Sequence, residues 1–392
     1  MAEEEISTSS WGSRLRNAFF GILMGFALIA AAIALIFWNE RHSLRTKQSL
    51  EQTAKALISV PNAPVDPKNN LKVVHISGLA TTTEELTDTI LGISVNAIHL
   101  HRKVKMYQWL EKTSTRSESQ VGGSERSIKT YSYRQDWSSN LINSDDFKYP
   151  KGHSNPKSFL IPSQLQYAKS VTLGDFTLPD DLIKKITVAQ PVNLNQVDKV
   201  ALEEQYKLPI FLYDNRIYIG HNEKQPKLGD LKISLNAAYP QEVSVIAQQT
   251  GNTLQAYSAP AGEIVLLLSA GNVSAQEMIA EALTQNKIFS WMVRVAALLI
   301  LIGGFSLIMK PLVVLADVLP FLGTLVGFGT GLLAVVLGLA LWLIFTAIAW
   351  FATRPYVSIA MISLVFVGGY LLIKKRKALK VQPKESLDRD PT

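Results

Sequence analysis

The chain of 392 residues contains no cysteine, and 47% of its residues are hydrophobic while only 18% are charged. Soluble domains usually carry about 25% charged residues, so this composition excludes a wholly soluble protein, a disordered chain and a disulfide-stabilised scaffold. The net charge of +7 raises the question of nucleic acid. Because the lysines and arginines cluster beside apolar segments, they indicate membrane topology instead, with the lipid bilayer as a partner and no nucleic acid.

The first apolar segment, residues 18–38, is 21 residues long and has no charged residue. A helix of about 20 residues crosses a hydrocarbon core of about 30 Å, which predicts a transmembrane helix here after a cytoplasmic N-terminus, residues 1–17. A cleaved signal peptide is the alternative, because Ala30, Ala31 and Ala32 are small enough for a signal peptidase. A signal peptide has a shorter apolar stretch with its cleavage site beyond it, so we favour an uncleaved anchor.

Three more spans are predicted near the C-terminus. From residue 295 to residue 373 the only charged residues are Lys310, Asp317 and Arg354, and these charges and the nearby prolines divide the segment. The predicted parts are transmembrane helices at residues 288–309, 328–351 and 355–373, an interfacial or re-entrant connector on the cytoplasmic side at residues 310–327, and a basic cytoplasmic tail at residues 374–392.

The orientation follows from the distribution of basic residues. Residues 374–377 are Lys-Lys-Arg-Lys, the strongest basic cluster of the chain. Cytoplasmic segments of membrane proteins carry an excess of Lys and Arg, which places the C-terminus in the cytoplasm. With four spans, both termini are cytoplasmic and residues 39–287 lie outside the cytoplasm. The basic residues that directly follow the first span, Arg41, Arg45 and Lys47, argue locally against this orientation.

Residues 39–287 are predicted to form a β-rich domain. Residues 100–111 alternate between apolar and polar side chains, and residues 127–137 place Tyr131, Tyr133 and Trp137 on one face. A period of two predicts strands, and the Ser/Gly-rich segment between them predicts a long hairpin with an aromatic face. The predicted fold class is an α+β membrane protein in which four transmembrane helices, one N-terminal and three C-terminal, flank a large, mainly-β extracytoplasmic domain.

The sequence predicts no catalytic, cofactor-binding or metal site. The absence of cysteine excludes thiolate nucleophiles and cysteine-ligated zinc. His99 and His101 could form half of a metal site, but no third ligand follows from the spacing. The segment from Gly152 to Pro156 resembles the first half of a nucleophile elbow, but Pro156 stands where that turn needs glycine, so an ordinary turn is favoured.

Two features in or directly beside the predicted membrane segments suggest contacts. Gly323, Gly327 and Gly331 recur every four residues, a spacing that lets helix backbones approach closely, either between copies of the chain or within one chain. Arg294, Asp317 and Arg354 could line a polar pathway, as in a channel or transport subunit. All three lie near predicted interfaces, where a charge costs little, so we do not favour that function.

The chain resembles the transmembrane protein 43 family, also called LUMA, over nearly its whole length. The similar stretches include residues 73–82 (VVHISGLATT), 106–111 (MYQWLE) and 131–147 (YSYRQDWSSNLINSDDF), and the order of one anchor, a large domain and three spans is also similar. The residues that match the central motif of the family are Tyr131, Tyr133, Trp137, Asn143, Gly152, His153, Asn155 and Pro156.

The resemblance implies a non-enzymatic multi-pass scaffold that self-associates, binds other membrane proteins and organises the membrane. The motif has no assigned chemistry in the family, which implies a fold element or an interaction surface. Animal members occupy the endoplasmic reticulum and inner nuclear membrane and bind emerin and lamins. The absence of cysteine and the single glycosylation sequon at Asn272 are typical of a bacterial member. In that case the protein lies in the inner membrane with a periplasmic domain, and emerin and lamins are not partners.

Overall fold

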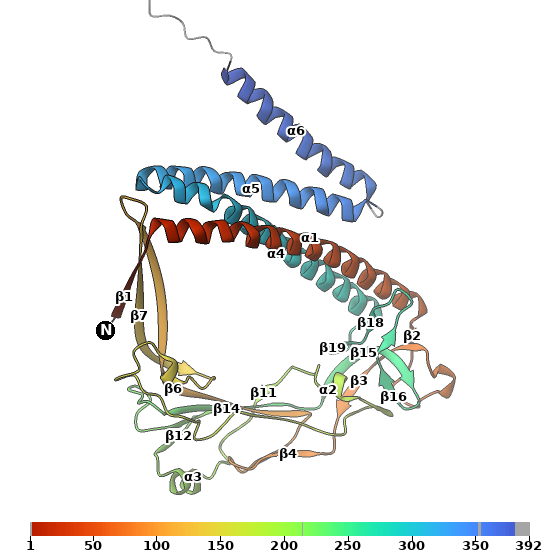
Figure 1. The fold of residues 1–392 in the computed structure, drawn as a ribbon. Helices are drawn as coiled ribbons and strands as arrows, with labels where there is room; N and C mark the ends of the chain where they lie inside the picture. Colours follow the sequence, from red (N-terminus) through yellow and green to blue (C-terminus); the bar gives the residue numbers. More distant parts are fainter. Residues whose placement is uncertain (1, 214, 352–353, 381–392) are drawn as a thin grey trace, which may run out of the picture. The chain divides into compact units, whose positions relative to one another are not determined.

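The computed structural model describes residues 2–213, 215–351 and 354–380 (Figure 1). The chain divides into two compact units. The β unit comprises Met1–Ser7, Arg45–Arg116 and Ser127–Gln285, and the helical unit comprises Thr8–Leu44, Ser117–Arg126 and Asn286–Thr392. In the described residues, four helices are long and apolar enough to cross a membrane, one near the N-terminus and three near the C-terminus. They flank the β-rich region, which confirms the predicted fold class.

The four long helices are α1 (Trp11–Ala56), α4 (Ala275–Ala316), α5 (Pro320–Trp350) and α6 (Pro355–Lys380). Helix α4 does not end at Lys310, as the sequence suggested, but continues through Pro311 to Ala316. Most of the expected connector at residues 310–327 is therefore helical. Proline inside a membrane helix is tolerated where neighbouring groups satisfy the freed carbonyl. The span boundaries and the sides of the membrane on which the loops lie remain predictions.

Small residues bring α1 and α4 close together in the helical unit. A Cβ atom placed on Gly25 would lie 2.6 Å from the carbonyl oxygen of Gly304, and one on Gly304 would lie 2.8 Å from Ile29. Around this contact a buried apolar cluster includes Ala32 and Leu301. In lipid, such close packing supplies attraction that the hydrophobic effect cannot supply between helices.

The β unit contains two large sheets. The 8-stranded sheet has the order β1-β7-β6-β14-β13-β12, with β11 paired to β14 and β8 paired to β6. The 7-stranded sheet has the order β19-β15-β16-β10-β9-β3-β2, and β15 also pairs with β3. The strands of the first sheet are β1 (Ala2–Ser9), β6 (His99–Ser119), β7 (Glu125–Ser138), β8 (Gln164–Tyr167), β11 (Gln190–Pro191), β12 (Ile210–Tyr213), β13 (Arg216–Ile219) and β14 (Leu231–Ala238). The strands of the second are β2 (Ile58–Ser59), β3 (Val73–Thr81), β9 (Thr172–Leu173), β10 (Phe176–Thr177), β15 (Gln241–Thr250), β16 (Thr253–Gln255) and β19 (Leu267–Ala270).

Short elements complete the β unit. Two separate strand pairs, β4 (Glu85–Asp88) with β5 (Ile93–Asn96) and β17 (Tyr257–Ser258) with β18 (Ile264–Val265), lie outside the large sheets. The short helices are α2 (Asp180–Ile183), α3 (Lys199–Tyr206), η1 (Pro67–Asn69) and η2 (Ser144–Asp146). At the start of α4, Ser274 and Glu277 accept hydrogen bonds from each other's backbone amides and so form a capping box.

The alternation of β6 decides which of its faces is buried. Leu100, Val104 and Met106 are almost fully buried and contribute to a core with β13 and β14, as the predicted period of two requires. Arg102 shares this apolar face and is only 2% exposed. It forms an ion pair with the equally buried Asp88, and this pairing satisfies a charge that would otherwise be costly in the core.

The N-terminal strand β1 was not predicted from the sequence. Residues Ala2–Ser9 pair with β7 at the edge of the 8-stranded sheet. Glu5 anchors this strand, because one carboxylate oxygen accepts a hydrogen bond from the Tyr131 hydroxyl at 3.0 Å and the other lies 2.9 Å from Lys148 Nζ. The hydrogen bonds from Lys148 and Tyr131 lower the pKa of Glu5 below its ordinary value.

Candidate functional site

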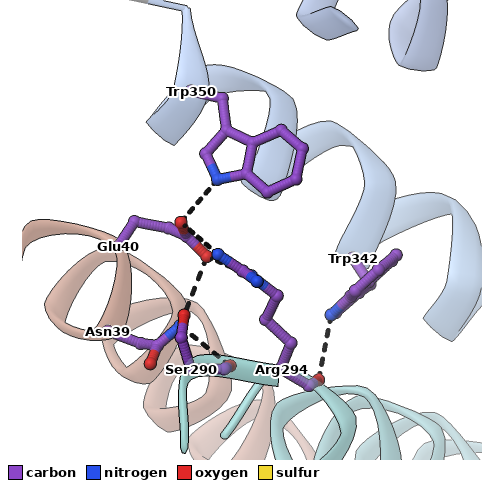
Figure 2. A network of polar contacts seen from close by, with 6 residues as sticks. All are labelled: Asn39, Glu40, Ser290, Arg294, Trp342 and Trp350. Carbon is purple, nitrogen blue, oxygen red and sulfur yellow. Dashed lines mark hydrogen bonds and ion pairs between the residues drawn. The ribbon is translucent and has the colours of Figure 1, made fainter. Parts of the chain in front are cut away.

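A buried ion pair joins α1 to α4 in the helical unit (Figure 2). Arg294 donates from Nε to one oxygen of Glu40 at 2.6 Å and from Nη2 to the other at 2.9 Å. The side chains of both residues are less than 10% exposed. Next to the pair, Asn39 Nδ2 donates to Ser290 Oγ at 3.0 Å. The two parallel hydrogen bonds from Arg294 to Glu40 attract the helices to each other. They also fix the rotation and register of α1 against α4.

Tryptophan side chains surround the pair and connect it to α5. Trp350 donates its indole N–H to Glu40, and Trp342 donates its indole N–H to the carbonyl oxygen of Arg294 at 3.0 Å (Figure 2). The guanidinium of Arg294 lies 5.0 Å from the ring centre of Trp350 and 4.9 Å from that of Trp291. These cation–π contacts and indole donors give both charges partners from the protein itself, so the cluster holds three helices together.

A second polar cluster lies around Arg14, near the beginning of α1. Arg14 is paired with Asp317, which follows α4, at 2.5 Å, and with Glu125 at 3.0 Å. Ser119 Oγ also donates to Asp317, at 3.1 Å. Trp11 Nε1 donates to the carbonyl oxygen of Val314 at 2.9 Å. This cluster joins the first turn of α1, the end of α4 and residues 117–126.

The three charged residues considered for a polar pathway do not come together. Arg294 is paired with Glu40, whereas Asp317 is paired with Arg14. Arg354 is exposed and stacks over Trp350 with its guanidinium 4.9 Å from the ring centre. Sequence reasoning missed Glu40 and Arg14 as partners. For Glu40 the sequence did contain a signal: an acidic residue directly after an apolar span needs a cation, and Arg294 lies in the next predicted span.

The three predicted packing glycines have different surroundings. A Cβ on Gly323 would lie 1.6 Å from Asp317 Oδ1, so this position admits only glycine without a rearrangement. A Cβ on Gly327 would make an ordinary contact with Val313 of α4 at 3.6 Å, and one on Gly331 would have no described residue within 4 Å. The sequence did not predict the closer contacts at Gly25 and Gly304. The two glycines lie on different helices, and only the packing of α1 against α4 brings them together.

The aromatic residues of the family motif meet as predicted across the hairpin and with the segment that follows it. Ring centres of Tyr107 and Trp137 are 5.2 Å apart. Tyr133 stacks on His153 at 3.9 Å, and Trp109 meets the edge of the same imidazole at 4.8 Å. Burial, together with the hydrogen bond that its hydroxyl donates to Glu111, raises the pKa of Tyr133 to about 12. These contacts fold residues 139–156 back onto the hairpin.

The polar residues of the motif bind the backbone of this segment. Asn155 accepts from the amide of Trp109 at 2.7 Å and donates to the carbonyl oxygens of Trp109 at 3.0 Å and Ile142 at 3.2 Å. Asn143 accepts from the amide of Asp145 and caps η2. Gly152 has φ of +86°, a conformation that favours glycine. Pro156 packs beside Gly229.

The turn from Gly152 to Pro156 does not have the geometry of a nucleophile elbow. Ser154 is exposed, and the contacts of the described residues bring no base to its hydroxyl. The imidazole of His153 bonds instead, through Nδ1, to the carbonyl oxygen of Tyr149 at 3.0 Å. A hydrolase of this type needs a base within hydrogen-bond reach of the nucleophile.

The two histidines of β6 are not part of a metal cluster within the described part of the chain, where no group of three or more His, Asp or Glu side chains could hold an ion. His99 is buried beside Tyr167, with ring centres 5.8 Å apart. Burial lowers the pKa of both His99 and His101, and the positive charge of Lys103 adds to this effect.

Comparisons with known proteins agree on one family. A model of the family described as transmembrane protein 43 matches residues 106–355. The chain is 30% identical over 365 residues to transmembrane protein 43 from Homo sapiens, with 90% of each chain covered. It is 31% identical over 353 residues to the Mus musculus protein, covering 87% of this chain and 86% of the relative. It is 27% identical over 363 residues to the transmembrane protein 43 homolog from Drosophila melanogaster, covering 90% and 94%.

No solved structure matches the chain. These relatives carry the names of membrane proteins and not of enzymes. Since the family model covers more than half of the 392 residues and the curated relatives align along most of their own length, the chain belongs to the transmembrane protein 43 family of multi-pass integral membrane proteins.

Proposed function

We propose that this protein is a non-enzymatic membrane scaffold that self-associates and organises other membrane proteins. One observation carries the proposal: two buried charges of the helical unit, Arg294 and Asp317, have opposite charges as partners inside the chain, Glu40 and Arg14, while many large apolar side chains of the helices are exposed. A bundle of this kind has a fixed internal arrangement and an apolar exterior for lipid or for other helices.

The β unit supports the same function. The motif residues that are polar, Asn143, His153 and Asn155, each bond to the protein backbone and so stabilise the folded hairpin. Side chains that bond to the backbone make the fold rigid and are not positioned for a catalytic step. A rigid domain attached to a membrane bundle is suited to presenting a contact surface.

Self-association can be tested at the open glycine of α5. Among the described residues, none lies within 4 Å of a Cβ placed on Gly331, so this position is open to packing against a second copy, whereas a Cβ on Gly338 would lie 2.8 Å from Ile302. We expect chemical crosslinking of the wild type in lipid nanodiscs to give discrete oligomers. Gly331→Ile should weaken them while the melting temperature stays unchanged.

The matched control is Gly338→Ile, which should lower the melting temperature because it forces α5 away from α4. A wild type that remains monomeric at all accessible concentrations would remove self-association from the proposal. An ester hydrolysis activity that disappears in Ser154→Ala, with the fold intact, would replace the scaffold by an enzyme.

A further inference from the structure

Strand β19 lies at one end of the 7-stranded sheet and pairs with β15 on one side only. In the part of the chain that the structure describes, its other side is an open edge of backbone amides and carbonyls. Proteins usually protect such edges with charged side chains, proline, a bulge or a very short strand. The sequence of β19 is Leu-Leu-Ser-Ala, with no charge and no proline, whereas β2 at the opposite end of the sheet is only 2 residues long. The edge of β19 is therefore available to another strand.

The pairing register shows which groups of β19 point outward. In an antiparallel pair, alternate residues bond to the partner strand, and the residues between them direct their amide and carbonyl away from it. The amide of Gly271 donates to the carbonyl oxygen of Glu242, so Ser269, two residues earlier, also bonds to β15. Leu268 and Ala270 therefore direct their backbone groups outward, where the described residues provide no hydrogen-bond partner for them.

A groove runs along this open edge. It consists of two adjoining hollows of about 330 and 390 Å³. The residues that line both hollows are Lys185, Thr187, Leu268, Ser269 and Glu281. Besides β19, the lining comes from residues 184–188 and from the first turns of α4. The outward backbone groups of β19 thus lie in a recess and not on a flat surface.

Lys185 marks one end of the groove. Its ammonium donates to the carbonyl oxygen of Leu266, directly before β19, and so replaces the donor that a neighbouring strand would supply. Partial desolvation lowers the pKa of Lys185, and the charge of Asp181 opposes this shift. None of the ion pairs among the described residues includes Lys185. A carboxylate at this end of the groove would therefore meet an ammonium that has no close counter-charge.

We propose that the edge of β19 binds an extended segment of a partner protein, which adds to the sheet as an antiparallel strand and places an acidic residue beside Lys185. Because β19 runs from Leu267 to Ala270, the C-terminal end of an antiparallel strand lies next to Leu266, where the ammonium is. Main-chain hydrogen bonds provide the affinity, and the charge selects the orientation. This inference rests on the proposed scaffold function and names the kind of segment that the scaffold holds.

Other occupants match the groove less well. A lipid acyl chain would leave the outward groups of Leu268 and Ala270 without hydrogen-bond partners, at a cost that a polypeptide backbone avoids. The sheet edge of a second folded copy is wider than a single strand, and the segments beside β19 obstruct its approach. Glu281 lines both hollows and would repel a run of acidic residues, so one carboxylate at the Lys185 end is the best match.

The charge is tested with a matched pair of peptides. The probe is fluorescein-labelled Thr-Val-Thr-Val-Thr-Val-Asp with an amidated C-terminus, titrated with the full chain in neutral phosphatidylcholine nanodiscs. Fluorescence anisotropy should show saturable binding. The peptide with Asn in place of Asp should bind about three- to fivefold more weakly, and this preference should disappear in Lys185→Gln. Equal affinity of the wild type for both peptides would overturn the assignment of the carboxylate to Lys185.

The backbone pairing is tested with proline. Ala270→Pro removes an outward amide hydrogen but no bond to β15, and proline is tolerated at edge positions of this kind. Peptide binding should weaken about tenfold, whereas Ala270→Val keeps the amide and should bind like the wild type. A peptide with proline in place of its central valine should also bind the wild type about tenfold more weakly, so a folding defect of Ala270→Pro does not decide the outcome.

Two results would overturn the proposal. One is the absence of saturable binding of the Asp peptide to the wild type. The other is unchanged affinity both in Ala270→Pro and with the proline peptide. Either result would remove this binding site and leave self-association standing, because the crosslinking of wild type and Gly331→Ile measures self-association separately.

Discussion

Replacing Arg294 with methionine should destabilise the helical unit severely. The substitution keeps most of the volume but leaves the Glu40 carboxylate without its cation, although that carboxylate is 9% exposed. Breaking a buried ion pair from one side typically costs about 3–5 kcal/mol, because an unpaired charge remains. The loss corresponds to about a hundred-fold or larger fall in the folding equilibrium constant. Equilibrium unfolding by SDS titration in mild detergent, followed by tryptophan fluorescence, measures the change.

A double variant separates the pair from the packing around it. Glu40→Gln removes the second charge and keeps an oxygen that can accept from Trp350. Arg294→Met with Glu40→Gln should therefore recover at least about 2 kcal/mol relative to Arg294→Met alone. Arg354→Met is the control, because Arg354 is exposed and stacks on the same indole, and it should cost less than about 1 kcal/mol. A double variant no more stable than Arg294→Met would refute the argument from charge.

Three further predictions concern other sites. Asn155→Ala should lower the free energy of unfolding of the β unit by about 2–4 kcal/mol, because it removes three hydrogen bonds to backbone groups, and a thermal melt at pH 7 measures the loss. Gly323→Ala should destabilise the helical unit by about 1–3 kcal/mol through overlap with Asp317, while Gly331→Ala, where the space is open, should be neutral in the same SDS titration. Burial lowers the pKa of His99 below its ordinary value of 6.5, so the unfolded chain binds a proton at this residue more readily than the folded protein does. The free energy of unfolding should therefore fall as the pH drops through 6.5. His99→Phe should reduce this pH dependence in thermal melts between pH 8 and pH 5.

The membrane helices and the main strands could be predicted because both depend on local patterns. The length of the apolar segments predicts the membrane helices. The alternation along β6 and β7 predicts strands and shows which of their faces is buried. Helix α4 was expected to end at residue 309, because Lys310 and Pro311 follow and proline is a reliable stop signal in water. Inside a membrane bundle, ending the helix would expose backbone groups to lipid. This is less favourable than continuing through the proline, so the helix continues.

The polar clusters could not be predicted, because their members are far apart in the chain. Glu40 and Arg294 are separated by 254 residues, and Arg14 and Asp317 by 303. Each residue taken alone is consistent with an interfacial charge, and only the packing of the helices distinguishes a buried pair from two surface groups. Strand β1 was missed for another reason: its three consecutive glutamates are poor strand formers, and its stability comes from the edge of β7.

The separation between Glu40 and Arg294 also has a consequence for synthesis. A ribosome adds about 5–20 residues per second, so the 254 residues added after Glu40, up to and including Arg294, take roughly 13–51 s to translate. During that interval α1 has already emerged with a carboxylate directly after an apolar segment and without its cation. Until α4 arrives, the nascent helix must keep the Glu40 carboxylate in contact with water. Membrane insertion of α1 and its packing against α4 are thus separate events. The Glu40 carboxylate meets its cation, Arg294, only in the second of them.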